Sequence, residues 1–504
     1  MTLMAAKKGK KSNKERYDFR ITNMGCFDEV TGTSVMVEVD GLKILLDLGS
    51  FQSQSHKLED IYKRNWSKSK IPFSEIDYII VSHAHADHCA LLPLCAREEL
   101  GFQGKIMCTE ASQGLIALNI TDCAFIMAQE CKAYNKHAKT PLYPIYSMED
   151  AEKTIPMFQG YGYDEDIRLN DRVSFRFIPN GHLFGSACIY ITYVKDEYTN
   201  KHLLFTGDHF YGANNLQKRP FTKSFDTEKT LKPSIVITES TYGGRYHDTK
   251  YNVEKELEKM ILESHRKGHI LFIPAFAIAR STQIAYYIKR IFERHPELMS
   301  DENYPIYMSG KMMAAAHRII GSERLKNEFV DEKWHDAYDL FQWSKIKKID
   351  NFMDVESNLI DNKPKIIIAS SGMISGGYST FLAEHLLPRG NVDVLLCGYQ
   401  AEGTVGRVLL DAVSKNGKRR AVIQGKEVRI KCNILGALTL SGHADERQLK
   451  EMITKQCDGR VLKKIVIIHG DEDAKESLKE DLEKTLNMDR KEIFIPKPNE
   501  IVKG

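Results

Sequence analysis

The sequence contains no cysteine pair with the CxxC spacing, although ten cysteines are spread along its 504 residues. Structural zinc fingers use such pairs, so we do not expect one here. No stretch approaches the ~18 consecutive apolar residues of a membrane span. The apolar residues from Met1 to Ala6 are too few for a signal-peptide core, and lysines follow at once. These absences predict a soluble, cytoplasmic protein with reduced thiols and no membrane partner.

The sequence also lacks a large excess of positive or negative charge, because the formal net charge is only +3. Bulk charge therefore does not indicate a polyanionic partner, and any basic surface must be local. Residues 7–16 (KKGKKSNKER) are basic and lack apolar side chains, so we expect residues 1–16 to form a disordered basic tail. The remaining chain has an ordinary globular composition and is long enough for two hydrophobic cores.

From residue 17 onwards, short β-rich runs alternate with stretches of helical spacing. The runs that predict strands are 35–39, 42–48, 78–82, 173–178, 188–194 and 202–207, then 234–240, 269–276, 304–310, 365–372, 392–399, 464–470 and 492–496. The stretches that predict helices include 110–137, 147–158, 250–266, 280–295, 445–456 and 474–486. Strands that alternate with helices favour a parallel α/β sheet.

The strongest chemical signal is the segment SHAHADH (82–88), which directly follows the apolar run YIIV. Several imidazoles and a carboxylate buried together would leave polar atoms unsatisfied, and a divalent metal resolves this. In an extended loop, His83 and His85 point the same way and can share one metal. Asp87 and His88 lie beyond the bend and can reach a second metal.

Three more donors stand at predicted strand ends: His182 in NGHLFGSA, Asp208 after HLLFTG, and His443 in LSGHAD. Alone, each is more often a turn residue or a helix cap. Together with the 83–88 segment they make seven donors, which suits a binuclear hydrolase with one carboxylate between its metals.

This order of motifs, with Asp47 ahead of them, resembles the metallo-β-lactamase fold. The middle of the chain is similar to the β-CASP subfamily, in the stretches TESTYGGRYH (238–247), IPAFAIARSTQ (273–283), ASSGMISGG (369–377) and GYQAEGTVGR (398–407). The resemblance covers roughly residues 17–504. It implies an α/β protein, a metallo-β-lactamase αββα sandwich with an inserted β-CASP α/β domain. The implied parts are residues 17–214 and 406–504 for the sandwich and 215–405 for the insert.

The resemblance also implies a ligand set for two Zn²⁺ ions per chain. One zinc is held by His83, His85 and His182, and the other by Asp87, His88 and His443, with Asp208 bridging them. Asp47 supports the metal loop from behind the ligands. Glu239 matches the acidic residue of the first β-CASP motif, which orients the ligands.

The implied activity is that of a metal-dependent hydrolase, a ribonuclease similar to bacterial and archaeal relatives of the pre-mRNA 3′-end cleavage subunit. A metal-bridging hydroxide would attack the RNA phosphodiester, with Asp87, Asp208 and Glu239 in catalytic roles. Glu239 and His443 favour the RNA branch over the DNA-processing branch of the subfamily. Candidate substrate-binding residues are Arg280, Lys311, Ser371 and Gly372, and a homodimer is left open.

Some features depart from the pattern. No histidine lies between residues 386 and 442, where the second β-CASP motif would place one, so the acid that protonates the leaving group is unassigned. His385 is the nearest upstream histidine, and we expect it on a helix surface. The alternatives are a DNA nuclease of the same fold, a small-molecule (thio)ester or lactone hydrolase, and a non-catalytic scaffold.

Overall fold

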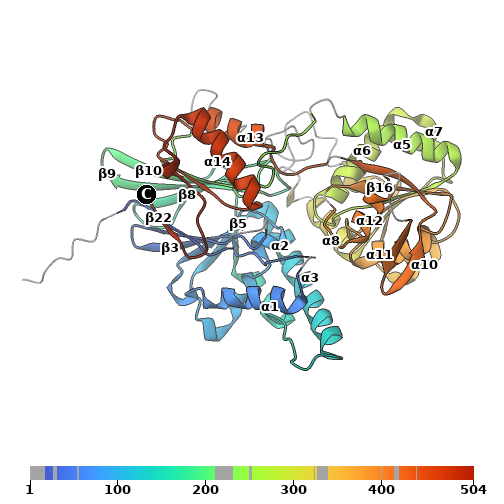
Figure 1. Cartoon of the computed structure of the whole chain (residues 1–504), viewed down its shortest axis with the longest axis horizontal. Helices are drawn as coiled ribbons and strands as arrows, with labels where there is room; N and C mark the ends of the chain where they lie inside the picture. The colour runs from blue at the N-terminus through green and yellow to red at the C-terminus, as the bar shows by residue number, and fades with distance from the viewer. Residues whose placement is uncertain are drawn as a thin grey trace, which may run out of the picture.

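A computed structural model describes residues 17–25, 31–53, 56–210, 231–248, 252–322, 324–325, 339–398, 400–413, 419–438 and 440–504. The predicted basic tail, 1–16, lies outside these residues. The described chain forms two lobes that lie side by side (Figure 1). One lobe is built from both ends of the chain and the other from its middle.

The first lobe contains two seven-stranded sheets. The spatial order of the first sheet is β22 (Ile501–Lys503), β1 (Arg20–Asn23), β2 (Val35–Val39), β3 (Leu42–Leu46), β4 (Tyr78–Ile80), β5 (Lys105–Thr109) and β6 (Phe158–Tyr161). Strands β3 to β6 run parallel, whereas β1 pairs antiparallel with both β2 and β22. The last strand therefore joins the first at one end of this sheet.

The second sheet has the order β21 (Ile493–Phe494), β20 (Lys464–Ile467), β11 (Ile235–Thr238), β10 (Thr199–Phe205), β9 (Ala187–Asp196), β8 (Val173–Pro179) and β7 (Ile167–Arg168). Strands β10, β11 and β20 are parallel neighbours, while β8, β9 and β10 form an antiparallel meander. These three parallel strands position three residues of the site.

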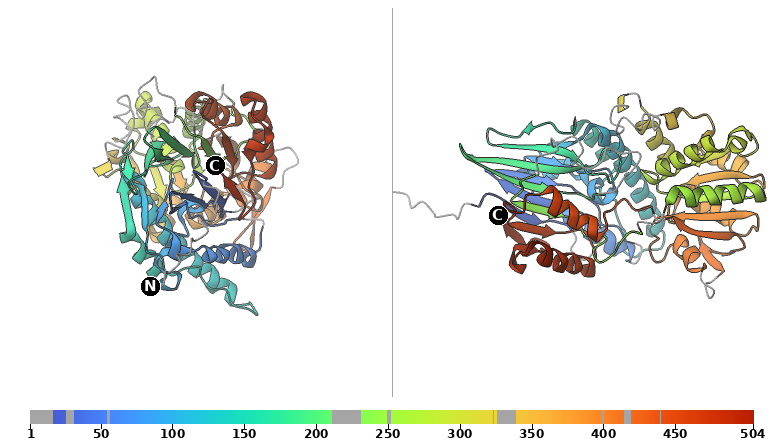
Figure 2. Two further views of the ribbon diagram at one scale, coloured as in Figure 1. Left: turned by 90° about the vertical axis from the view of Figure 1, so that its left-hand side faces the viewer. Right: turned by 90° about the horizontal axis from the view of Figure 1, so that it is seen from above.

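The two sheets pack face to face through alternating apolar side chains such as Val37, Ile44, Phe175 and Ile237. Helices α1 (Leu58–Ser67) and α3 (Glu110–Asn135) cover the outer face of the first sheet (Figure 2). Helices α13 (Glu446–Glu451) and α14 (Glu472–Leu486) cover the outer face of the second. This is the predicted αββα sandwich, and the fold prediction is confirmed.

The second lobe has a six-stranded sheet of order β14 (Ile346–Ile349), β13 (Ile306–Ser309), β15 (Lys365–Ala369), β12 (Ile270–Pro274), β16 (Val392–Cys397) and β19 (Asn433–Leu438). All its pairings are parallel. On β12, Leu271 and Ile273 face α5 (Val253–Lys267), α6 (Arg280–Arg294) and α8 (Lys311–Ile320). Ile270 and Phe272 face α10 (Phe352–Leu359), α11 (Gly377–Leu386) and α12 (Val405–Asp411). A sheet covered on both faces explains the nearly continuous apolar runs of its strands.

The structure places the limits of this inserted lobe later than the predicted 215–405. The strand at 235–238 belongs to the sandwich, because β11 pairs with β10 and β20. At the other end, β19 pairs with β16, so the insert continues to about residue 438 and includes the hairpin of β17 (Arg420–Ile423) and β18 (Lys426–Arg429). The predicted boundary at 214/215 lies outside the described residues.

Among the described residues, helix α3 alone is long and apolar enough to cross a membrane, by length and composition. Its side chains Leu115, Ile116 and Ile120 are completely buried in the core. A core helix of a folded domain passes the same test, so α3 is weak evidence for a membrane.

Candidate metal centre

The metal loop leaves the carboxyl end of β4 and enters the short helix α2 (Ala86–Cys89). The loops before and after the first hairpin clamp it: Thr33 N donates to Asp87 O at 2.9 Å and Leu48 N donates to His88 O at 2.9 Å. A Cβ atom at Gly49 would lie 1.6 Å from Asp87 O, so only glycine fits there. The opening hairpin therefore fixes the backbone that carries four donors.

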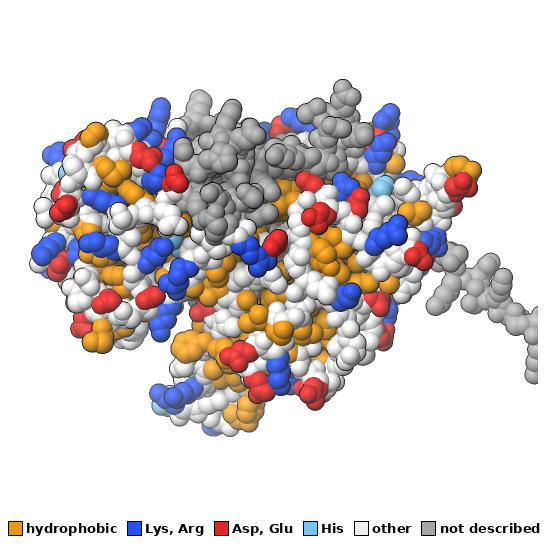
Figure 3. All heavy atoms as spheres, turned by 180° about the vertical axis from the view of Figure 1, so that it is seen from behind, with side chains coloured by type: hydrophobic (Ala, Val, Ile, Leu, Met, Phe, Trp, Pro, Cys, Tyr) orange, Lys and Arg blue, Asp and Glu red, His pale blue; other side chains and the backbone are white. Residues whose placement is uncertain are grey.

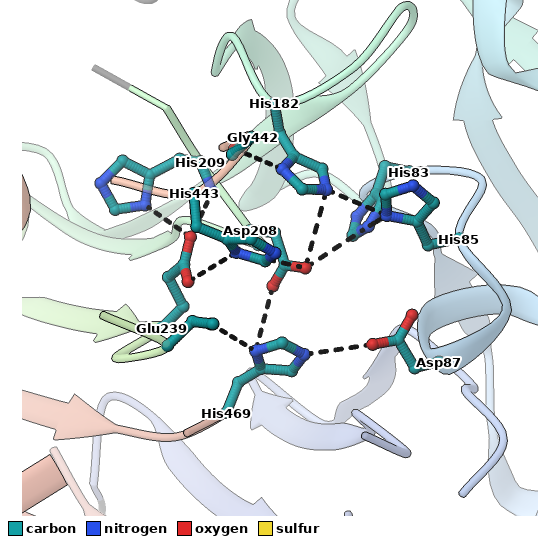
Figure 4. Close-up of polar contacts among 12 residues, drawn as sticks. His83, His85, Asp87, His182, Asp208, His209, Glu239, Gly442, His443 and His469 are labelled. Carbon is teal, nitrogen blue, oxygen red and sulfur yellow. Dashed lines mark hydrogen bonds and ion pairs between the residues drawn. The ribbon is translucent and has the colours of Figure 1, made fainter. Parts of the chain in front are cut away.

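Asp208, Glu239 and His469 come to this loop from three parallel strands of the second sheet. They follow β10, β11 and β20, which are neighbours in that sheet. Because the carboxyl ends of parallel strands meet at one edge, the three side chains converge there (Figure 4).

The first donor group contains His83, His85, His182 and Asp208, whose donor atoms all lie within 4.8 Å of one another. His85 Nδ1 lies 3.2 Å from His83 Nε2 and 3.0 Å from His182 Nε2. Asp208 Oδ2 faces the same point, 3.7 Å from His83 Nε2 and 3.8 Å from His182 Nε2. The structure brings together the three histidines that the sequence assigned to one metal.

The second donor group contains Asp87, His88, Asp208 and His469. Asp208 Oδ1 lies 3.3 Å from His88 Nε2 and 3.4 Å from His469 Nδ1. Asp87 Oδ2 lies 3.3 Å from His469 Nε2. The two oxygens of Asp208 therefore face two different groups, as a bridging carboxylate would.

His443 was expected in this second group, and the structure does not place it there. His469 occupies that position, while His443 lies with Asp208 and Glu239. The physical reason is topological: β20, which leads to His469, pairs with β11 directly beside the metal loop, whereas His443 follows β19 of the inserted lobe.

The charges of the two groups fit divalent cations. Asp208 Oδ1 is buried without a hydrogen-bond partner among the described residues. Burial opposes a charge on His88, yet Asp208, Asp47 and Asp87 hold its pKa well above the usual range. Burial and the neighbouring histidines hold the pKa of His83 and His182 well below it. His83 and His182 are thus neutral imidazoles, and the carboxylates around His88 favour a positive charge beside them. Neutral imidazoles next to carboxylates are the donor set of zinc.

Asp47 lies behind the metal loop and hydrogen-bonds to it. It is fully buried. Its Oδ2 accepts hydrogen bonds from His88 Nδ1 and from Ser82 Oγ, each at 2.7 Å, and its Oδ1 accepts one from Ser82 N at 2.7 Å. His88 is thereby turned so that Nε2 faces the donor group.

We expect Asp47→Asn to weaken metal binding about 10–100-fold, because the amide cannot hold His88 in the same tautomer with the same basicity. Competition between the metal-free protein and a zinc-binding dye measures this. Asp171→Asn, at an exposed carboxylate, is the matched control. Unchanged zinc affinity in Asp47→Asn would show that Asp47 does not support the ligands.

Asn180 joins two ligand loops and was missed by the sequence analysis. It is completely buried. Its Nδ2 donates to Asp208 O at 2.7 Å and to Thr206 O at 3.0 Å, and its Oδ1 accepts from His182 N at 3.3 Å. The backbone of Asp208 is therefore tied to that of His182.

Glu239, which is buried, and the partly exposed His443 form a hydrogen-bonded pair beside the donor groups (Figure 4). Glu239 Oε2 accepts from His443 Nδ1 at 2.9 Å, and its Oε1 accepts from His209 N at 2.7 Å. The His443 side chain is 22% exposed, whereas those of His83, His88, His182 and His469 are at most 3% exposed. His443 is thus more exposed than these four histidines and similar to Asp87, whose side chain is 20% exposed.

The predicted substrate-binding residues lie at one edge of the six-stranded sheet. Arg280, Lys311 and the pair Ser371–Gly372 follow β12, β13 and β15. The Ser371 hydroxyl accepts a hydrogen bond from Ser375 N of its own loop. Gly372 lies against Phe276, where a Cβ atom would be 2.9 Å from Phe276 N. Arg280 lies against Gly442, in a loop of the metal centre.

Comparison with known protein families places three matches along the chain. Residues 28–98 match the metallo-beta-lactamase superfamily, residues 261–409 match the Beta-Casp domain, and residues 427–496 match the Zn-dependent metallo-hydrolase RNA specificity domain. The first and last of these contribute to the sandwich, and the middle one lies in the inserted lobe.

Curated relatives are similar over most of the chain. The transcription termination factor FttA of Methanocaldococcus jannaschii is 26% identical over 469 residues, which are 90% of this chain and 67% of that longer protein. A ribonuclease of Thermus thermophilus is 25% identical over 466 residues, 90% of this chain and 94% of the relative.

A solved structure of a protein of unknown function from Enterococcus faecalis shares the fold. It aligns with a TM-score of 0.55 at 13% identity and covers 96% of this chain and all of that one.

The sandwich and its convergent His/Asp groups define a metallo-hydrolase of the metallo-β-lactamase fold. The inserted lobe and the order of the three matches narrow this class further. The chain belongs to the β-CASP subfamily of the metallo-β-lactamase superfamily.

Proposed function

We propose that this protein is a zinc-dependent ribonuclease that hydrolyses RNA phosphodiester bonds. The observation that carries the proposal is the pair of donor groups that share Asp208, with the Glu239–His443 pair beside them. The match to an RNA specificity domain and the similarity to a ribonuclease support RNA as the substrate.

In this proposal one zinc is held by His83, His85 and His182, and the other by Asp87, His88 and His469. Asp208, whose two oxygens face the two donor groups, would be shared by both ions. Bound zinc supplies Lewis acidity, which stabilises charge developing on phosphate oxygens and lowers the pKa of water. Asp87 and Asp208 would hold the metal ions in position. Asp47 and Asn180 hold the loops that carry the ligands.

His443 is the residue proposed to protonate the leaving oxygen, the role that the sequence left unassigned. Nδ1 is held by Glu239, and Nε2 has no protein partner among the described residues. Burial disfavours the charged ring, but Glu239 and Asp208 raise the pKa of His443 to about 9. The protonated ring can therefore donate from Nε2, and Glu239 keeps Nδ1–H in place.

This assignment predicts how Glu239→Gln changes the pH profile. Donation needs protonated His443, so kcat/KM falls as pH rises through its pKa. The carboxylate raises that pKa, so we expect the alkaline limb of Glu239→Gln to move to lower pH. Profiles of kcat/KM on one RNA, with zinc content determined in both proteins, measure the shift. An alkaline limb that stays in place or moves to higher pH contradicts the role of Glu239.

The proposal is tested by cleavage of a labelled RNA and the DNA of the same sequence, with and without chelator. We expect RNA cleavage that chelator abolishes and zinc restores, and little cleavage of DNA. Asp208→Ala protein, prepared in parallel, controls for contaminating nucleases. Equal cleavage of DNA would favour the DNA nuclease, and hydrolysis of neither would exclude both.

We also propose that the chain holds two zinc ions and that the protein lies in the cytoplasm. Elemental analysis after purification without chelator should give two zinc ions per chain. The nine cysteines that the structure describes are free thiols, which is typical of a reducing cytoplasm. A homodimer stays a prediction that sedimentation can check.

A further inference from the structure

Arg280 of the inserted lobe reaches the edge of the metal centre. A Cβ atom at Gly442 would lie 2.3 Å from Arg280 Nη2 and 3.1 Å from His182 Nδ1. Gly442 O accepts a hydrogen bond from His182 Nδ1 at 2.5 Å and precedes His443 in the chain. The guanidinium therefore lies against the backbone between a ligand and the proposed proton donor.

The charge of Arg280 has no carboxylate partner in the described parts of the chain. Its Nη1 donates to Gln283 Oε1 at 2.8 Å, and no ion pair joins it to an acidic residue there. The titratable groups that act on it are Tyr242, Tyr287 and Cys397, and burial lowers the pKa of Arg280. A partly buried cation usually pairs with an anion, so the charge of Arg280 is available to an anionic ligand.

The position of Arg280 in its helix strengthens this point. Arg280 is the first residue of α6, a helix of 15 residues whose N-cap, Ala279, provides no side-chain cap. The amino end of a helix carries partial positive charge, so a cation is unfavourable there and an anion is favourable. The amino end of α6 and the guanidinium together create a region of positive charge beside the metal centre.

We propose that Arg280, with the amino end of α6, binds the phosphate of a nucleotide adjacent to the one being cut. The inference rests on the proposed function and names what the site recognises beyond the bond that is cut: a second phosphate on the same strand. Gln283 holds the guanidinium in place, since it accepts from Nη1 and leaves Nη2 directed toward Gly442. Arginine suits this task because its planar fork can donate two hydrogen bonds to one phosphate.

The test compares Arg280→Gln with the wild type on two substrates of the same chemistry. A dinucleoside monophosphate has one phosphate, and an RNA decamer has several. We expect Arg280→Gln to lower kcat/KM for the decamer about tenfold, mainly through KM, and to leave the dinucleoside monophosphate within about twofold. Arg280→Lys should recover part of the loss, because it restores the charge but not the fork.

Arg294→Gln is the matched control, since Arg294 lies at the other end of α6 and pairs with Glu254 and Glu258. Zinc content and thermal stability of each variant confirm that folding and metal loading are intact. Equal losses on both substrates would overturn the proposal, because Arg280 would then act through His182 or His443. An unchanged KM for the decamer would overturn it as well.

Binding of the fluorescent decamer to metal-free protein gives a second readout. We expect weaker binding by Arg280→Gln and a shallower salt dependence, by about 0.7 in the logarithmic slope for one lost phosphate contact. A wild type that binds the RNA but cuts none would contradict the proposed function, and this experiment would still decide the Arg280 site. The same affinity and the same salt dependence in both proteins would show that Arg280 does not bind a phosphate of the RNA.

Discussion

Asp208→Ala should abolish hydrolysis and lower kcat/KM by at least about 10³-fold, which corresponds to about 4 kcal/mol of barrier. Each oxygen of Asp208 faces one donor group, so its loss removes a ligand from both metals at once. Zinc bound per chain should fall from two to below one. Rates on labelled RNA and elemental analysis of the same preparation measure the two effects together.

Asp166→Ala is a suitable control, because Asp166 is exposed and contacts only Arg176 among the described residues. It should behave like the wild type in both measurements. An Asp208→Ala protein that keeps two zinc ions and most of its activity would contradict the bridging role.

His469→Ala and His443→Ala should both be inactive, but for different reasons. His469→Ala removes a donor of the Asp87–His88 group, so we expect one zinc per chain. His443→Ala leaves both donor groups intact, so we expect two zinc ions and a loss of about 10²–10⁴-fold in kcat, the range for a general acid. Zinc content therefore separates the two variants where activity alone does not.

His385→Ala serves as the control for both. His385 lies on α11, where its Nδ1 contacts Phe381 O of the same helix, and it belongs to neither donor group. Its activity should stay within about twofold of the wild type. The opposite pattern, with His443→Ala losing a zinc and His469→Ala keeping two, would restore the ligand set that the sequence suggested.

Comparison with the sequence-based predictions shows which features local patterns encode. The segment 82–88 was sufficient to locate the metal loop, because several donors within one short loop have few structural explanations. The sequence analysis assigned His443 to the second metal and passed over His469. Both follow a strand, and IVIIHG at 465–470 carries the signal that drew attention to His182 and Asp208. The choice depends on β20 lying beside β11, which is a property of the folded sheet.

The boundaries of the inserted lobe were mispredicted for a related reason. The apolar run at 235–238 would have the same sequence pattern in the sandwich or in the insert. Its parallel pairing with β10 assigns it to the sandwich. Strand β19 was overlooked because its sequence, NILGAL, begins with asparagine and contains a glycine, and its side chains are mostly half-buried. The pattern of apolar residues predicts a strand, but it does not show with which other strand it pairs.

The Glu239–His443 pair shows a second limit of sequence reasoning. The resemblance implied that Glu239 orients the ligands, yet in the structure its partner is a histidine 204 residues away, contributed after the insert. No spacing in the sequence predicts that contact. Only the return of the chain from the second lobe to the first brings the two side chains together.

The late position of His469 has a consequence for biosynthesis. The ribosome makes the chain from its amino end, and the donors at 83–88 emerge long before residue 469. The strand that carries His469 must then enter the sheet between β11 and β21. A nascent chain still attached to its own messenger RNA therefore holds an incomplete cutting centre until residue 469 has been translated and its strand has entered the sheet.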